Sequence, residues 1–183
     1  MASVLVPIAQ GCEELEAVTV IDLLRRAKID VTTAGLDDQP VKASRGTVLV
    51  PDTALDEALT QSFDMIILPG GLPGADHLDS DSRIHAILQS MARAGKYVAA
   101  ICAAPKVLAH AGLLNNRSAT SFPGTLENTG IDNIQISVDP VVVDDNIITS
   151  RGPGTAMDFA LTLIETLVGK SVRDQVESTL QRP

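Results

Sequence analysis

The sequence predicts an α/β fold in which a mostly parallel central sheet is covered by helices on both faces. Short apolar, β-branched segments alternate with segments of helical periodicity along the 183 residues. Several of the strand-like segments are apolar throughout, as expected for strands that are covered on both faces. No linker or low-complexity segment interrupts this alternation, so residues 1–183 are expected to form a single domain around a substantial core.

The first half of the chain supplies three strands, one helix and a hairpin. In order, we expect a strand at 3–9, a helix at 13–27, a strand at 29–35, a hairpin at 41–51 and a strand at 64–71. The polar face of the helix is marked by Asp22, Arg25 and Arg26, and Arg45-Gly46 provides the turn of the hairpin. The last strand ends in Gly70-Gly71, which favours an abrupt turn there.

The second half repeats the pattern and ends in a long helix. We expect a helix at 82–94, a strand at 97–101, a helix after Cys102, a mostly irregular segment at 115–133, a hairpin at 140–150 and a helix at 155–168. Thr155 and Asp158 have the spacing of a capping box for the last helix. Its apolar stripe is expected to comprise Met157, Ala160, Leu161, Ile164, Leu167 and Val168.

Composition argues against several classes of function. The net charge is -9, from 14 Lys and Arg against 23 Asp and Glu without a basic cluster, so neither nucleic acid nor an anionic membrane is an expected partner. The three histidines lack metal-ligand spacing, so we expect no metal site. Without a membrane-length apolar run or a signal-peptide pattern at the N-terminus, a cytoplasmic protein is expected.

The unusual residues follow the ends of predicted strands, which is where open α/β sheets bind ligands. Cys102 comes directly after the strand at 97–101, with alanine two positions to either side, and this is the pattern of a nucleophile elbow with cysteine in place of serine. A helix N-terminus there would lower the pKa of the thiol. The alternative is a small buried cysteine at a crowded turn, and spacing alone leaves both interpretations open.

Glu16 and the glycines at 70–71 are further candidates. If Glu16 points inward, burial would raise the pKa of its carboxyl and keep it protonated, whereas the alternative is a solvated first-turn glutamate. Gly70-Gly71 frees backbone N–H groups that would form an oxyanion hole with the N–H of Ala103, and a simple tight turn explains the glycines equally well.

Two other types of site receive little support. Gly152 and Gly154 precede a helix and match the first two glycines of the dinucleotide-binding motif GxGxxG, but Met157 replaces the third glycine. A structural turn is therefore favoured over a phosphate loop. No histidine adjoins Cys102. His85 and His110 are expected within helices and His77 in a polar loop, which disfavours a Cys-His hydrolase.

Taken together, the motifs resemble the ThiJ/PfpI superfamily, and most closely its branch of the Parkinson-disease protein deglycase and the bacterial YajL proteins. Five motifs carry the resemblance in order and spacing, and they are GCEELEAV, ASRG, ILPGG, AAICAAP and TSRGPGTAMDFAL. The resemblance implies a flavodoxin-like three-layer sandwich, a homodimer, an oxidisable Cys102, and a protonated Glu16 beside it. It also implies oxyanion-hole N–H groups at Gly71 and Ala103. Further residues near the pocket or dimer interface would be Gly70, Arg45, Ser150, Arg151 and Pro153.

The activity implied by the resemblance is a cofactor-independent glyoxalase or protein deglycase that acts on methylglyoxal, glyoxal or early glycation adducts and protects against oxidative and carbonyl stress. The alternative is a redox-sensing holdase chaperone in which Cys102 is oxidised to sulfinate. Phe122 precedes Pro123 where many relatives carry histidine, which removes a general base and disfavours protease activity. Cys12 replaces a small residue and is a conceivable redox partner of Cys102.

Overall fold

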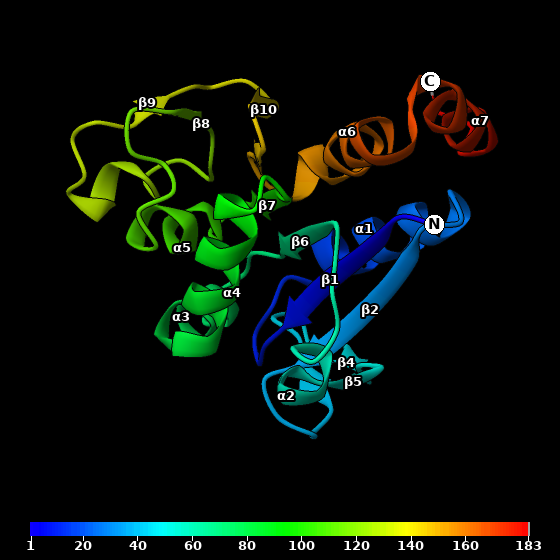
Figure 1. Cartoon of the computed structure of the whole chain (residues 1–183), viewed down its shortest axis with the longest axis horizontal. Helices are drawn as coiled ribbons and strands as arrows, with labels where there is room; N and C mark the ends of the chain where they lie inside the picture. The colour runs from blue at the N-terminus through cyan, green and yellow to red at the C-terminus, as the bar shows by residue number, and fades with distance from the viewer. Residues whose placement is uncertain (183) are drawn as a thin grey trace.

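The central sheet of the protein, described for residues 1–182 by a computed structural model, has strand order β10-β11-β7-β6-β1-β2-β5 (Figure 1). The strands are β1 (Ser3–Ile8), β2 (Asp30–Gly35), β5 (Thr53–Ala54), β6 (Met65–Leu68), β7 (Tyr97–Ile101), β10 (Val141–Asp144) and β11 (Ile147–Ser150). All neighbouring pairs in this sheet are parallel except β10 and β11, which form the predicted hairpin. The predicted flavodoxin-like α/β architecture is confirmed.

Apolar residues on both sides of each strand build two cores. In β1, Val4, Val6 and Ile8 pack into the core on one face, and Leu5 packs into the core on the other. This follows from the period of two in a strand, which sends successive side chains to opposite faces. A strand buried on both faces must therefore be apolar throughout, and that is the pattern the sequence shows.

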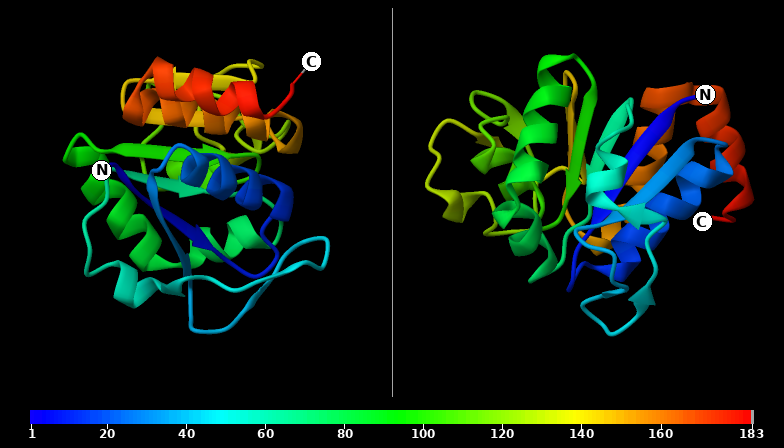
Figure 2. Two further views of the ribbon diagram at one scale, coloured as in Figure 1. Left: turned by 90° about the vertical axis from the view of Figure 1, so that its right-hand side faces the viewer. Right: turned by 60° about the horizontal axis from the view of Figure 1, so that its bottom comes forward.

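Helices cover both faces of the sheet. The layer on one face is formed by α1 (Glu14–Arg26), α6 (Ala156–Val168) and α7 (Lys170–Thr179). The layer on the other face is formed by α2 (Leu55–Ala58), α3 (Gly74–Ser80), α4 (Ser82–Arg93) and α5 (Pro105–His110). Figure 2 shows the sheet between the red and orange helices α6 and α7 and the green helices α3 and α4. No helix within the described residues has the length and apolar composition that a membrane crossing requires.

Two small ladders lie outside the main sheet. β3 (Val41–Lys42) and β4 (Val48–Leu49) pair antiparallel and form the predicted hairpin. β8 (Ser118–Ala119) pairs with β9 (Gln135–Ile136), and the segment 115–133 is otherwise mostly irregular, as predicted.

The strands β5, β8 and β9 and the helices α2, α3 and α7 were not predicted. α2 has four residues and α3 has seven, which is too short for a clear helical period, and α7 buries only Val176. Gly169, with φ of +91°, separates α7 from α6. As a consequence, His77 lies in α3 and the predicted polar loop at that position is wrong.

Two predictions for the last helix are also wrong. Thr155 does not cap α6 with its side chain, because its hydroxyl instead donates to the Gly152 carbonyl at 2.9 Å and accepts from the Gly152 N–H at 3.1 Å. Met157 does not belong to the buried stripe and is 44% exposed, whereas Ala160, Leu161 and Ile164 are buried as predicted. Ala156 and Phe159 in the first turn are buried as well, so the face of α6 that packs on the sheet includes the first turn and leaves out Met157.

Candidate active site

Cys102 occupies a strained turn between β7 and α5. Its φ is +65°, in the left-handed region that non-glycine residues rarely adopt. The Cys102 N–H donates to the carbonyl of Ser150 at 3.0 Å, and the Cys102 carbonyl accepts from the N–H of Phe122 at 2.8 Å. These bonds to chain segments on both sides hold the backbone in a conformation that would otherwise relax. The geometry is that of the predicted nucleophile elbow.

Glu16 lies beneath this turn and is fully buried. Its Oε2 accepts from the Gly70 N–H at 2.9 Å, and Oε1 has no conventional hydrogen-bond partner within residues 1–182. The carboxyl lies beside Cys102, close enough for the ionisation of each group to affect the other. The solvated alternative for Glu16 is therefore excluded.

Glu13 and Glu14, unlike Glu16, bind the β3–β4 hairpin. Glu14 accepts from the N–H groups of Arg45 and Thr47, at 3.0 and 3.3 Å, and Glu13 accepts from the Ser44 hydroxyl at 2.9 Å. The N-terminus of α1 thus fastens the β3–β4 hairpin with two carboxylates and directs the third into the site.

Gly70 provides the space in which Glu16 and Cys102 meet. A Cβ built at Gly70 would lie 2.6 Å from the Cys102 Cβ and 2.8 Å from Glu16 Oε2, distances that real side chains do not tolerate. Gly71 has a φ of +86°, and its N–H, together with that of Ala103, lies against the Cys102 sulfur and favours the thiolate. The structure therefore brings together Cys102, Glu16, Gly70, Gly71 and Ala103, as the sequence analysis expected.

The pKa values show that Glu16 and Cys102 form a coupled pair. Burial raises the pKa of Glu16 to about 7. Burial, and next to it the negative charge of an ionised Glu16, raises the pKa of Cys102 to about 12. Two adjacent negative charges are unfavourable in a buried site, so the pair carries one negative charge near neutral pH. A thiolate forms at neutral pH only while Glu16 keeps its proton.

The expectation that a helix dipole lowers the pKa of Cys102 is therefore corrected. α5 begins three residues after the cysteine, at Pro105, and has only six residues. Proline has no N–H to donate, and a helix this short has a weak dipole. The groups that favour the thiolate are the N–H groups of Gly71 and Ala103.

The loop after β11 forms the other wall of the site. Ser150 accepts the Cys102 N–H through its carbonyl and donates its hydroxyl to the Pro140 carbonyl at 2.8 Å. Arg151 donates from Nη1 to the Val138 carbonyl at 2.7 Å. With Pro153 and the exposed Phe122, Arg151 lines a groove of about 350 Å³.

Two predicted residues form no bond to the Cys102 side chain among the described residues. Arg45 lies at the tip of the hairpin, and its guanidinium forms no ion pair with any residue in the range 1–182. Cys12 and Cys102 are both free and buried. Burial and the charge of Glu14 raise the pKa of Cys12 to about 11, so this thiol is also protonated. A redox role for Cys12 stays a prediction.

A second groove, of about 450 Å³, lies on the α5 side of Phe122 and is lined by residues that were not predicted as candidates. Lys106 and His110 line it together with Leu72 and Ala103. Their spacing of four on one helix places both on the same face, a signal that was available once α5 was assigned. His110 was set aside as a helix-interior residue, although its side chain is 41% exposed.

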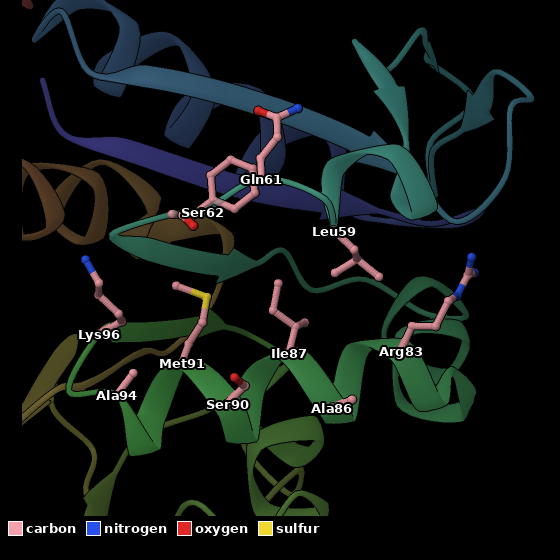
Figure 3. Close-up of a pocket in the computed structure, with 11 residues that line it drawn as sticks. Leu59, Gln61, Ser62, Arg83, Ala86, Ile87, Ser90, Met91, Ala94 and Lys96 are labelled. Atoms are coloured by element: carbon pink, nitrogen blue, oxygen red, sulfur yellow. The ribbon is translucent and has the colours of Figure 1, made fainter.

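A further groove, of about 500 Å³, lies far from this chemistry, between α4 and residues 59–63 (Figure 3). Leu59, Ile87 and Met91 point into it, and Arg83 and Lys96 stand at its opposite ends. Both cations are already paired, Arg83 with Asp56 and Asp81 and Lys96 with Asp64. The described residues also contain no cluster of His, Cys, Asp or Glu suited to a metal ion.

The fold and site define a class of α/β proteins that carry a cysteine on the turn after a parallel strand, beside a buried carboxyl group. The chain belongs to the DJ-1/PfpI family, whose model matches residues 2–166. It is 46% identical over 178 residues to Protein DJ-1alpha of Drosophila melanogaster, covering 96% of this chain and 82% of that protein. It is 37% identical over 169 residues to the glutathione-independent glyoxalase DJR-1.2 of Caenorhabditis elegans, covering 92% and 89%.

Solved structures agree with this assignment. The crystal structure of Drosophila melanogaster DJ-1beta superposes with a TM-score of 0.95 at 42% identity, covering 100% of this chain and 98% of that one. Oxidised DJ-1 of Toxoplasma gondii superposes with a TM-score of 0.93 at 37% identity, covering 98% of each chain. The resemblance found in the sequence motifs is thereby confirmed.

Proposed function

We propose that this protein is a cofactor-independent glyoxalase or deglycase that acts on methylglyoxal, glyoxal or early glycation adducts through Cys102. The observation that carries the proposal is the buried contact between Glu16 and Cys102, with the N–H groups of Gly71 and Ala103 on the sulfur. The C. elegans relative named a glutathione-independent glyoxalase supports the same chemistry. We propose a protective role in carbonyl and oxidative stress on the same grounds.

The chemistry follows from the positions of these groups. The Cys102 thiolate adds to the aldehyde of methylglyoxal, and the oxygen that becomes negative accepts from the N–H groups of Gly71 and Ala103. Glu16, which is protonated while the thiolate exists, gives its proton to that oxygen. Its carboxylate then takes the proton from the former aldehyde carbon and returns it to the ketone carbon, while the hydroxyl proton passes to the ketone oxygen, so that the hemithioacetal becomes a thioester. Water hydrolyses the thioester to lactate and returns the thiol. Aldehyde oxidation balances ketone reduction, so the reaction consumes only water and needs no cofactor.

The test is a lactate assay with methylglyoxal on the wild type and on Cys102→Ala and Glu16→Ala variants. Cys102→Ala should abolish lactate formation. Glu16→Ala should keep the fold, seen as an unchanged circular dichroism spectrum, and cut turnover by about 10²-fold or more. Near-wild-type turnover by the cysteine variant would end the proposal.

A redox-sensing holdase in which Cys102 is oxidised to sulfinate is the second candidate. The observation that favours it is the free Glu16 Oε1, which in its protonated form would donate to a sulfinate oxygen. The solved structure of oxidised Toxoplasma gondii DJ-1 shows that a relative is isolated in an oxidised form. Peroxide followed by intact-mass analysis tests this role. Two added oxygens on Cys102 without glyoxalase turnover would favour it, and a loss of two hydrogens would indicate Cys12–Cys102 pairing.

We also propose that the protein acts as a homodimer through an apolar surface on α1, the β3–β4 hairpin with the residue that follows it, and the start of α6. This surface comprises Leu15, Val18, Val48, Val50 and Met157, all of which are exposed in the single chain. Val18 and Val50 line one groove, so the two elements form a continuous surface. Arg45, whose guanidinium has no ion pair within residues 1–182, stands beside it. Val50→Asp should convert the dimer to monomer in sedimentation experiments, whereas a monomeric wild type would refute the proposal.

A further inference from the structure

The 450 Å³ groove on the α5 side of Phe122 begins at the candidate active site. Ala103, whose N–H lies against the Cys102 sulfur, lines the groove, and so does Leu72, which follows Gly71. Phe122 also lines it and donates its N–H to the Cys102 carbonyl. The groove is thus continuous with the residues that hold the sulfur. Its volume lies in the range of pockets that hold drug-sized molecules, far larger than methylglyoxal requires.

His110, at the other end of the groove, is held in a fixed orientation. Its Nδ1 donates to Asp79 Oδ2 at 2.7 Å, and the same aspartate receives His85 Nε2, which donates to the Asp79 main-chain carbonyl at 2.7 Å. Asp79 belongs to α3, His85 to α4 and His110 to α5, three helices that pack against one another (Figure 1). This arrangement leaves Nε2 of His110 without a hydrogen-bond partner among residues 1–182.

The position of His110 argues for binding and against a step at the sulfur. α5 has six residues, so its length is about 9 Å, and His110 is the last of them. A three-carbon aldehyde is shorter than this helix. A molecule that extends along the groove from Cys102 to His110 is therefore expected to be longer than methylglyoxal.

The other groups in the groove match a peptide chain. The Asn128 amide and the Thr125 hydroxyl line it and have no side-chain hydrogen bonds within the described residues, while Leu72 and Phe122 present apolar side chains that are more than half exposed. Lys106 is paired with Asp76, so the groove does not demand a charged occupant. Free donors and acceptors beside apolar patches suit the amide groups and side chains of a peptide.

We propose that this groove binds the peptide portion of a carbonyl adduct whose carbonyl carbon meets Cys102. His110 is then a specificity residue, and Asp79 is the residue that positions it. The proposal rests on the proposed function of Cys102 and narrows its substrate class to adducts carried on peptides and proteins.

The experiment compares two alkylating agents that modify Cys102. One is iodoacetamide, and the other is a neutral hexapeptide with an iodoacetyl group on a lysine side chain. In both, the thiolate forms a bond to carbon and iodide leaves. Peptide mapping at Cys102 gives the limiting rate and the half-saturating concentration for the wild type and for His110→Ala, His110→Gln and Asp79→Asn. His77→Ala, on the exposed side of α3, is the matched control.

We expect the wild type to saturate with the peptide reagent and not with iodoacetamide. His110→Ala should raise the half-saturating concentration roughly five- to tenfold and leave both the limiting rate and the iodoacetamide rate unchanged. The half-saturating concentration of His110→Gln should lie between those of the wild type and His110→Ala. It should rise less in Asp79→Asn than in His110→Ala, and it should not change in His77→Ala.

A wild type that does not saturate, or a His110→Ala variant that changes both reagents equally, would overturn the proposal. Alkylation does not need catalytic turnover, so a protein without glyoxalase activity still gives a clear result. Conversely, an active glyoxalase that fails to saturate would reject the groove and leave the proposed chemistry standing.

Discussion

The carboxyl of Glu16 lies against the thiol of Cys102 in a buried site, and the space between them exists because residue 70 has no side chain. Burial raises the pKa of Glu16 to about 7, and an ionised Glu16 opposes ionisation of the thiol. The two groups therefore share one negative charge near neutral pH. Much of the behaviour of the protein follows from this pair.

The reactivity of Cys102 should rise through pH 7 and then level off. The first proton leaves the pair with the pKa of about 7 that belongs to Glu16, and the second is held until about pH 12. Iodoacetamide labelling of Cys102 between pH 5 and 9 measures the profile. In Glu16→Gln the inflection near pH 7 should disappear, because the variant has no carboxyl proton to lose. An unchanged profile would contradict the coupling.

The pKa of Glu16 also predicts how stability depends on pH. Folding raises this pKa from 4.5 to about 7, so the folded state favours the protonated form. The contribution of Glu16 to the free energy of unfolding is fully present below pH 4.5, and it is lost as the pH rises through about 7. From the size of the shift, the loss amounts to about 3 kcal/mol.

Urea denaturation of the wild type and Glu16→Gln at pH 5 and pH 8 measures this loss. Between pH 5 and pH 8, the free energy of unfolding of the wild type should fall relative to that of the variant, so that the variant compares more favourably at pH 8. Glu127→Gln, at an exposed position, is the control and should show no such gain. The prediction would be refuted if the difference in free energy of unfolding between Glu16→Gln and the wild type were the same at pH 5 and pH 8.

The sequence alone predicted most of the sheet because burial on both faces forces strands such as 97–101 to be apolar throughout. It predicted Cys102 and Glu16 as candidates because each follows a strand end. It did not decide whether Glu16 points inward, since a first-turn glutamate between Leu15 and Ala17 has no helical pattern that distinguishes it from Glu14. The direction of its side chain depends on a gap at Gly70, 54 residues away.

The misjudged pKa of Cys102 has a similar origin. A strand followed by a helix suggests a helix dipole at the cysteine, but the length of α5 and the burial of the thiol arise from packing. The spacing of Lys106 and His110 places both on one face of α5, but the orientation of His110 could not be predicted. Its partner Asp79 lies in α3, a helix too short to be predicted from its pattern.

Replacing Gly70 with alanine should abolish activity and destabilise the fold. The added methyl would lie 2.6 Å from the Cys102 Cβ and 2.8 Å from both Glu16 Oε2 and the Ile101 carbonyl. Overpacking of this kind costs about 1–3 kcal/mol. Thermal unfolding and the lactate assay measure both effects. Gly154→Ala is the control, because a Cβ there meets nothing within 4 Å, and a stable, active Gly70→Ala variant would show that the site relaxes.

Removing the Glu14 carboxylate should release the β3–β4 hairpin from α1. Although some desolvation opposes ionisation, the N–H groups of Glu14, Arg45 and Thr47 lower the pKa of this carboxyl to about 2. The anchor is therefore complete above pH 4.5 and is lost only as the pH falls through about 2. In Glu14→Ala at pH 7, amide hydrogen exchange at Arg45 and Thr47 should accelerate by on the order of tenfold. The Lys42 amide, which donates to Gln10 Oε1, is the internal control. If all three amides exchange as in the wild type, the hairpin is held by Ser44 and its own ladder, and Glu14 is not its anchor.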